Sequence, residues 1–575
     1  MTRDLIVRVL DFNRSARRRL MAGVLQAGRR GDVFDFLTCI WIVAVAAVAL
    51  FTVRDYAISN DEGVQHHYAQ LILNYYSSGF VDRDLFAFHN LYLYGGLFDV
   101  VTLLLAKVIP LDPFELSHIL CVLSGIGGIA ASAATARIIA GSRAALIAAV
   151  ALSLCGQWYG AMFNHTKDIP FAAAMMGATL VLVRATNRLP SPGSGDRLAF
   201  GLLTGAALGI RSLGLLLLAY LPLAILLKLP SLSWSDRGLA ARFVVKSLAA
   251  MLPATALACL IMLISWPWAA LSPLNPIRGL LAFSEFHYEI RTLFAGTAYQ
   301  MADVPRWYVP VYILIKVPLV TLAGAAAAMI VALLRGRLTT RQRRDAGLLA
   351  LTVLVPLACQ VALHGPAFTG MRHFLFLLPP LTALTGIGLN EALRWLNAQG
   401  RALAMGGVGV ICACFLLEAN NLYTLHPYEN LSYNSLVGGI KGAYRNYDLD
   451  YWFNSMPEAI RDLEAYLREA RPSARLAPPP AIYSVAVCGE RLSFDRNVTL
   501  PQLRFDFRPE WRDSEFFVAP TNMNCDQDLD GDIVATVARA GVPIAYVKDR
   551  RSIMNAPTTT MASPRLATDA QRQND

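Results

Sequence analysis

Two short stretches carry the side chains that could do chemistry. The first, Ser59–His67, places two carboxylates, two amides and two imidazoles within nine residues, directly after the first apolar run. Ionisable groups at the mouth of a membrane helix are costly, which favours a working role for them. The second stretch, Asn164–Pro170, also follows an apolar run and carries a further carboxylate. We expect the two stretches to meet on one side of a membrane.

Three carboxylates in these stretches are the candidate catalytic residues, Asp61, Glu62 and Asp168. One of them could take a proton from an acceptor hydroxyl or amine, while a second orients the acceptor or a partner cation. The alternative is that the acidic pair is an ordinary solvated loop. Asp168 could also cap the helix that begins at Pro170, and this role is compatible with the catalytic one.

A metal site is the weaker interpretation of the same residues. His66 and His67 could hold a divalent cation together with Asp61, but their spacing matches no zinc-ligand pattern. We therefore predict no metal ligands and keep a divalent cation as an alternative. The acidic run Asp526–Asp532 begins like a calcium loop, yet its twelfth position is Val537, where a bidentate glutamate belongs.

Cations on the outer side could bind a phosphate leaving group, because arginine can hold phosphate through two hydrogen bonds. The candidates are Arg211, Arg278, Arg291, Arg306, Lys316 and Arg372. Lys316 lies inside an apolar run, so it either extends to the interface or meets an anion in a cavity. Arg306 could equally anchor the chain at the interface beside Trp307.

An outer loop, residues 283–300, is rich in groups that could line or gate a pocket. It contains Glu285, His287 and Tyr288. The alternative for this stretch is a partly ordered loop without a role in binding.

The composition is that of a multi-pass membrane protein. Of the 575 residues, 55% are hydrophobic and only 16% are charged, whereas soluble domains are about 25% charged. The formal charge of +10 is better explained by cytoplasmic loops than by nucleic-acid binding. The arginine-rich residues 1–33 are predicted to be a cytoplasmic tail, and not a cleavable signal peptide.

Charge distribution gives a topology of about eleven crossings, with interfacial helices in residues 62–90. Residues 91–110 are apolar but carry Asp99 and a Gly-Gly pair, and we predict that they do not cross. If residues 91–110 do not cross, nearly every basic cluster near a span lies on the cytoplasmic side, as the positive-inside rule requires. The predicted crossings are 34–53, 115–136, 144–161, 169–183, two within 198–228, 247–268, 307–334, 346–364, 374–393 and 402–418.

The chain is predicted to divide into a membrane domain, residues 34–419, and a small outer α/β domain, residues 420–555, with a disordered tail, residues 556–575. Pro478–Pro480 is predicted to be a rigid hinge. The predicted helices of this domain are 456–470 and 532–540, and its strands are 481–487, 516–519 and 543–548. Cys488 and Cys525 either pair, if the compartment is oxidising, or stay free thiols.

These motifs resemble those of polyprenyl-phosphate-dependent glycosyltransferases of the GT-C fold, in the superfamily of protein O-mannosyltransferases and lipid A aminoarabinose transferases. The resemblance covers residues 34–420. It depends on the acidic pair at Asp61, on Asn164–Pro170 and on the segment Met371–Leu381, MRHFLFLLPPL. The segment after the last helix, His426–Glu429, also looks like one found in bacterial members.

The resemblance implies an inverting transfer from a polyprenyl-phosphate sugar on the periplasmic face of a bacterial inner membrane. Asp61 and Asp168 match the family's acidic residues, and Arg372 matches a basic position. A lysine-proline pair of some relatives is absent, and His89 stands near its place. The full set of implied or predicted substrate-binding residues is His66, His89, Lys167, Arg211, Arg278, Glu285, His287, Arg291, Lys316 and Arg372.

The acceptor could be a lipid A core, another glycan or a protein. A multi-pass transporter or flippase of lipid-linked sugars is the alternative function. Such a protein needs internal repeats and charges at the membrane midplane, whereas the charges here gather at one face and no repeat is visible.

Overall fold

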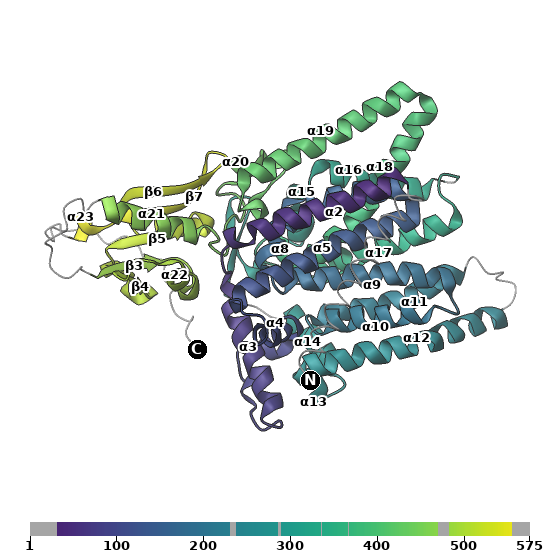
Figure 1. Cartoon of the computed structure of the whole chain (residues 1–575), viewed down its shortest axis with the longest axis horizontal. Helices are drawn as coiled ribbons and strands as arrows, with labels where there is room; N and C mark the ends of the chain where they lie inside the picture. Colours follow the sequence, from purple (N-terminus) through teal and green to yellow (C-terminus); the bar gives the residue numbers. More distant parts are fainter. Residues whose placement is uncertain are drawn as a thin grey trace, which may run out of the picture. The chain divides into compact units, whose positions relative to one another are not determined.

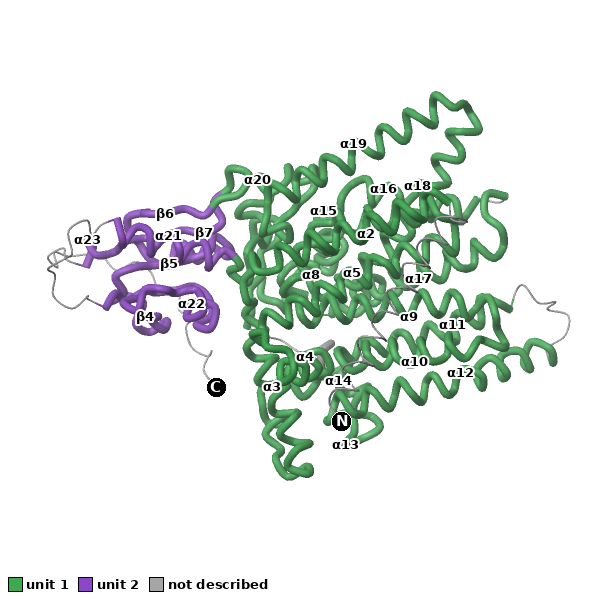
Figure 2. The backbone as a smooth tube through the Cα atoms, viewed as in Figure 1, with its two compact units in different colours: residues 1–454, 538–542 green, residues 455–537, 543–575 purple. Residues whose placement is uncertain are grey.

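The computed structural model describes residues 32–229, 237–285, 289–334, 336–365, 367–469 and 482–554. The chain forms two compact units (Figure 2), one of residues 1–454 and 538–542, the other of residues 455–537 and 543–575. Most of the predicted basic tail, the Pro478–Pro480 hinge and the predicted disordered tail lie outside the described residues.

The first unit is a helical bundle (Figure 1) in which seven helices are long and apolar enough to cross a membrane. They are α2 (Val33–Thr52), α5 (Pro113–Ala140), α9 (Asp168–Arg188), α12 (Arg237–Ser265), α17 (Thr340–Leu363), α18 (Leu378–Gln399) and α19 (Arg401–Leu425). Local sequence explains their ends. In α5, for example, the Asp112 carboxylate accepts a hydrogen bond from Phe114 N at 2.9 Å and proline occupies the first turn, while Gly141 follows with a φ of +94°.

Two further spans are broken by sharp bends, which brings the number to nine if each pair is one span. The pair α6 (Ser142–Ser153) with α7–α8 (Gly156–Asn164) bends by 67°. The pair α15 (Tyr308–Lys316) with α16 (Leu319–Leu333) bends by 114° at Pro318, which lacks the N–H that a continuous helix needs.

Shorter helices account for the rest of the predicted crossings. Residues 198–228 form α10 (Ser194–Leu208) and α11 (Leu215–Lys228), each shorter than the roughly 20 residues that span a bilayer core. Thus every predicted crossing corresponds to a helical segment, but these two are not among the seven to nine candidate spans. Residues 91–110 contain only α4 (Leu97–Ala106), which extends about 15 Å and agrees with the prediction that this stretch does not cross.

One end of the bundle is covered by short elements. Helix α3 (Asn60–Ser77) begins with a capping box, in which the Glu62 carboxylate accepts a hydrogen bond from Ser59 N at 2.7 Å. Its apolar side packs with the loop after it through Tyr68, Ile72 and Leu85. Helices α13 (Pro267–Leu271) and α14 (Asn275–Glu285) and the hairpin β1 (Arg291–Phe294) and β2 (Thr297–Gln300) follow α12.

The second unit contains a five-stranded sheet in the order β4-β3-β5-β7-β6. The strands are β3 (Tyr483–Val487), β4 (Leu503–Asp506), β5 (Phe516–Pro520), β6 (Asp532–Arg539) and β7 (Val542–Asp549), and the helices include α21 (Met456–Glu469) and α22 (Arg491–Asn497). Strand β3 lies parallel to β4 and β5, while β5 and β7 are antiparallel. A disulfide joins Cys488 to Cys525, with their Cα atoms 6.6 Å apart.

The prediction of a helix over residues 532–540 is wrong, because this stretch forms β6. Its β-branched residues, such as Ile533 and Val537, suit an extended strand. A two-residue turn then follows, in which Ala540 and Gly541 have φ values of +49° and +76°. Positive φ at both positions is the conformation of a tight hairpin turn. The turn pairs residues 532–539 with β7, so this stretch forms a strand and not the predicted helix.

Candidate active site

Four segments that are far apart in the sequence bring two carboxylates and two guanidinium groups together at one end of the bundle. Asp61 lies in the first turn of α3 and Asp168 begins α9, while Arg372 precedes α18 and Arg211 follows α10. The Arg372 Nη2 atom donates to Asp61 Oδ2 at 2.5 Å, and its Nε lies 3.3 Å from Asp168 Oδ2. Arg211 donates to the other oxygen of Asp168. The two predicted stretches therefore meet, with Arg372 between them.

The two carboxylates differ in exposure. The Asp61 side chain is 37% exposed, whereas that of Asp168 is 5% exposed and contacts both arginines. Asp61 is therefore the carboxylate that an incoming molecule can reach, and Asp168 holds the arginines in place.

Residues after the last helix complete the surroundings of Arg372. Its guanidinium group lies over the Trp452 ring, 4.4 Å from the ring centre. The neighbouring Tyr451 hydroxyl lies 2.5 Å from Nε2 of His165, and Asn164 Nδ2 donates to Asn454 Oδ1 at 2.8 Å. Burial, reinforced by the charge of Arg372, holds the pKa of His165 well below its usual range. The imidazole is therefore neutral and shares a hydrogen bond with Tyr451.

Lys167 places a third cation beside the carboxylates. Its Nζ atom lies over the Tyr94 ring, 4.3 Å from the centre, and Arg211 approaches the same ring at 5.9 Å. Burial lowers the pKa of Lys167 to about 8, an effect that the nearby Asp99 carboxylate partly offsets. The charge of this lysine is therefore sensitive to pH in the neutral to alkaline range.

Glu62 occupies a different environment from its neighbour Asp61. Its side chain is fully buried, and its carboxylate lies 3.0 Å and 3.2 Å from His118 Nε2 in addition to accepting the Ser59 N–H. His118 comes from α5, so the pair ties the start of α3 to the bundle. Glu62 is thus closed to solvent and links the first turn of α3, which carries Asp61, to α5.

The other predicted binding residues lie apart from the arginine pair. His66 is buried and packs on Phe114 at 4.5 Å, with Nδ1 3.2 Å from Glu62 O. His89 is exposed and contacts Phe88. Lys316 is buried at the break between α15 and α16, within electrostatic reach of the Asp448 carboxylate. It donates to Asn430 O at 2.9 Å and lies over the Tyr433 ring at 3.8 Å.

The outer-loop candidates are distributed over separate local structures. Arg278 donates to Asn275 Oδ1 at 3.3 Å within α14, and Arg291 pairs with Gln300 across the β1–β2 hairpin. Glu285 ends α14, and His287 lies outside the described residues. Of the predicted substrate-binding residues, the structure thus brings Lys167, Arg211 and Arg372 to the carboxylate pair.

The residues that sequence reasoning missed are aromatic or lie in the first turns of a span, as His118 does in α5. Tyr451 and Trp452 lie in the polar run DLDYWFN, residues 448–454, whose density of acidic and aromatic residues was the available signal. His118 gave none, since a lone histidine in an apolar helix is usually a core residue. Within the described residues, no group of three or more histidines, cysteines or acids is arranged to hold a metal ion.

No family model matches this sequence, and no curated protein matches it. Among solved structures, it is similar to ArnT from Cupriavidus metallidurans bound to undecaprenyl phosphate, with 16% identity and a TM-score of 0.44 over 88% of this chain and 97% of that one. It is also similar to the Archaeoglobus fulgidus oligosaccharyltransferase, with 14% identity and a TM-score of 0.45 over 78% of this chain and 62% of that one. A third match is the arabinofuranosyltransferase AftD from Mycobacteria, with 14% identity and a TM-score of 0.40 over 88% of this chain and 41% of that one.

All three are GT-C glycosyltransferases, the class that the sequence motifs resemble. Because the identities and TM-scores are low, the assignment of function depends on the residues of this chain's own site.

Proposed function

We propose that this chain is an inverting glycosyltransferase that moves a sugar from a polyprenyl-phosphate donor to an acceptor at the outer face of the membrane. The observation that carries the proposal is the joining of Asp61 and Asp168 by Arg372, with Arg211 on the far side of Asp168. This arrangement places the exposed carboxylate of Asp61, which can act as a base, beside cations that can bind a phosphate.

Asp61 is the proposed general base. An oxygen or nitrogen of the acceptor attacks the anomeric carbon, and the bond from that carbon to the donor's phosphate oxygen breaks with both electrons leaving on the phosphate. The acceptor's proton passes to the exposed carboxylate of Asp61. A single displacement of this kind inverts the anomeric carbon. Arg372 fixes the orientation of the carboxylate through the 2.5 Å hydrogen bond.

The two arginines are the proposed phosphate ligands. Nε of Arg211 is buried and has no hydrogen-bond partner within the described residues, and Nε of Arg372 has only the 3.3 Å ion-pair contact with Asp168 Oδ2. Buried donors are usually satisfied, so an unsatisfied donor next to an open carboxylate favours a ligand that accepts hydrogen bonds. The leaving phosphate gains negative charge in the transition state, and fixed cations stabilise such charge most strongly in a site shielded from water. Lys167 adds a further positive charge at neutral pH.

We place the site on the outer, periplasmic side of a bacterial inner membrane. The Cys488–Cys525 disulfide supports an oxidising compartment for the second unit. Trp452 and Asn454 lie at the arginine–carboxylate site, and the second unit begins directly after them in the chain. Because no candidate span follows them in the described residues, we place the site and the second unit on the same side of the membrane. The basic clusters at the other helix ends agree with a cytoplasmic location for those ends.

The test is turnover by the full-length protein in detergent, where no second compartment exists. We expect release of polyprenyl phosphate and glycosylation of an added acceptor. Asp61→Asn should lower kcat by a factor on the order of 10²–10⁴, the usual contribution of a general base. Asp84→Asn, which changes an exposed carboxylate in the loop after α3, is the matched control and should keep full activity.

Undiminished transfer by Asp61→Asn would contradict the proposed base. A wild-type protein that transfers nothing in detergent, but moves lipid-linked sugar across vesicle membranes, would instead establish the transporter alternative.

A further inference from the structure

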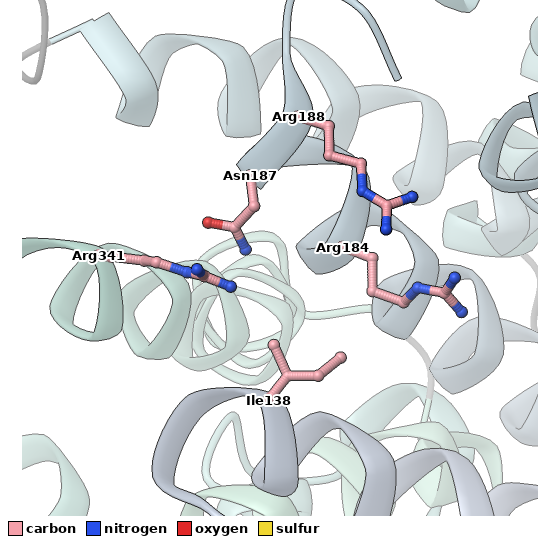
Figure 3. Close-up of a pocket in the computed structure, with 5 residues that line it drawn as sticks. All are labelled: Ile138, Arg184, Asn187, Arg188 and Arg341. Carbon is pink, nitrogen blue, oxygen red and sulfur yellow. The ribbon is translucent and has the colours of Figure 1, made fainter. Parts of the chain in front are cut away.

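A small open cavity lies at the opposite end of the bundle from Asp168. It opens between the C-terminal ends of α5 and α9 and the first turn of α17 (Figure 3). Its volume is about 250 Å³, and the residues that line it are Ile138, Arg184, Asn187, Arg188 and Arg341. Three of the five are arginines, in a protein of which only 16% is charged.

Helix α9 fixes the depth of this cavity in the membrane. Asp168 begins the helix and Arg188 ends it, and the helix has 21 residues. At 1.5 Å per residue the two ends are about 30 Å apart, which is the thickness of a bilayer's hydrocarbon core. A cavity at Arg188 therefore lies at the interface opposite the proposed active site, where lipid headgroups are found.

The arginines are held in place by buried carboxylates that they share. Arg184 and Arg188 both contact Asp196, at 3.1 Å and 2.8 Å, and Arg341 and Arg344 both contact Asp345, at 3.8 Å and 2.6 Å. Each carboxylate thus has two cations, so each cluster keeps a net positive charge. The Asp196 and Asp345 side chains are 2% and 1% exposed, whereas the three lining arginines are 48–61% exposed.

Asn187 connects α9, the helix that carries Arg184 and Arg188, to the Asp345 cluster. Its Nδ2 donates to Asp345 Oδ2 at 3.1 Å and to Val183 O at 2.9 Å, and its Oδ1 accepts from Arg344 Nη2 at 2.5 Å. Figure 3 shows Arg341 on one side of the opening, facing the end of the helix that carries Arg184 and Arg188. The positive groups of two helices are therefore fixed around one small space.

We propose that this cavity binds the phosphate headgroup of an anionic phospholipid in the inner leaflet. Basic pockets between helices on the cytoplasmic side are suited to such headgroups, and exposed guanidinium groups can each give a phosphate two hydrogen bonds. The volume is below the roughly 300–1,000 Å³ of sites that enclose a whole drug-sized ligand. It suits a headgroup whose acyl chains stay in the bilayer, with Ile138 as the apolar wall.

The test measures lipid binding to the full-length, detergent-purified protein by native mass spectrometry. The probes are phosphatidylglycerol, the zwitterionic phosphatidylcholine, and inorganic phosphate as competitor. We expect phosphatidylglycerol to bind more tightly than phosphatidylcholine. The double variant Arg188→Gln/Arg341→Gln removes two charges and should weaken phosphatidylglycerol binding roughly thirty-fold.

A matched control removes two charges from the same end of the bundle without changing the cavity. Arg394 and Arg401 lie at the end of α18 and the start of α19, so Arg394→Gln/Arg401→Gln should leave the affinity within about two-fold. If the control loses as much affinity as the cavity variant, the attraction is a general surface effect and the proposal fails. It also fails if the two lipids bind equally or if millimolar phosphate displaces the lipid completely, which would indicate a free-anion site.

Loss of folding is separated from loss of binding by a milder variant. Arg341 makes the longest of the four ion pairs, 3.8 Å to Asp345, so Arg341→Gln disturbs the buried carboxylates least. We expect this variant to elute and melt like the wild type and still to bind phosphatidylglycerol about five-fold more weakly. Wild-type affinity in a folded Arg341→Gln protein would overturn the proposal.

Discussion

At the scale of the residue, Arg372 is the side chain on which the site depends. It contacts Asp61, Asp168 and the face of Trp452 at once. A planar guanidinium group can face an aromatic ring while it donates to carboxylates at its edge, which an ammonium group cannot do in the same way. The site therefore needs the planar guanidinium group of an arginine at this position, and not only a positive charge.

Lys167 gives the site a pH dependence. Its pKa is lowered from the ordinary 10.5 to about 8 in the folded protein, chiefly by burial. Below pH 8 the side chain is charged and can attract the donor's phosphate, whereas above pH 8 it is neutral. We predict that kcat/KM for the donor falls as the pH rises through about 8, because kcat/KM reports the free enzyme's titrating groups.

The measurement is a pH profile of kcat/KM for the wild type and for Lys167→Met. The variant should have a lower kcat/KM at pH 7 and no decrease centred near pH 8. Lys107→Met, at the end of α4, serves as the control and should keep the wild-type profile. A profile of Lys167→Met with the same alkaline decrease as the wild type would assign the titration to another group.

Part of this site could be predicted from residue types and part could not. Asp61, Asp168 and Arg372 stand out because charged groups at the ends of apolar runs are costly. Tyr451 and Trp452 do not, since they are more than 280 positions from His165 and only the folded chain brings them to it. The polar surroundings of Lys316 are likewise formed by distant residues, Asn430 and Tyr433, so its contacts could not be foreseen from the apolar run that contains it.

At the scale of the element, the break between α6 and α7–α8 makes room for the segment that follows α19. Gly156 and Gly160 face this segment, and a Cβ atom on them would lie 2.4 Å from Glu429 O and 2.3 Å from Asn430 N. A Cβ atom essentially never comes this close to an atom it is not bonded to, so only glycine permits this close packing. The same segment continues to Trp452, and the fit of these glycines therefore affects the position of the site.

We predict that Gly160→Ala destabilises the protein by about 1–3 kcal/mol, the usual cost of overpacking a close contact. Transfer activity should fall further than the folded fraction does, because the displaced segment carries the residues around Arg372. Gly127→Ala in α5 is the control, since its added Cβ would meet nothing within 4 Å and alanine favours a helix. The measurements are the melting temperature in detergent and the specific activity of the folded fraction. A Gly160→Ala protein that melts and turns over like the wild type would show that the backbone shifts there without cost.

The positions of the helices could be predicted well, because hydrophobic runs and caps determine them locally. The bend within run 307–334 could have been predicted from Pro318, whereas the bend within run 144–161 could not, since no proline or charged residue interrupts that run. The strand at residues 532–539 was missed for a different reason. Its β-branched residues fit a strand, but the turn at Ala540–Gly541 and the pairing with β7 that decide its conformation lie outside the segment itself.

At the scale of the whole molecule, the chain is a multi-pass helical membrane protein with a separate α/β unit near its C-terminus. The proposed chemistry and the proposed lipid cavity lie at opposite ends of α9, about one bilayer core apart. Positive charge is used differently at the two ends. Beside Asp61 and Asp168 it is placed to receive a leaving phosphate, whereas around Arg188 and Arg341 it is placed to hold the protein against one leaflet.

This sidedness leads to a prediction about the second unit. Cys488 and Cys525 are 37 positions apart and join the end of β3 to the segment after β5. Closing a loop of this length restricts the unfolded chain and stabilises the fold by about 4 kcal/mol. Such a bond persists in an oxidising compartment and is rare in the cytosol. We therefore predict that the bond is formed in living cells, on the side of the membrane where the transfer takes place.

The measurement traps thiols in intact cells by acid quenching and alkylates them under denaturing conditions. The sample is then reduced and labelled with a maleimide that shifts the protein's mobility on a gel. Two sites should become available only after reduction in the wild type, and none in Cys488→Ser/Cys525→Ser, because the remaining cysteines are free and are blocked in the first step. If both thiols of the wild type are already blocked before reduction, the second unit lies in a reducing compartment. The proposed site, which precedes that unit in the chain without a further crossing, would then lie in the same compartment, and a donor sugar presented on the outer face could not reach it.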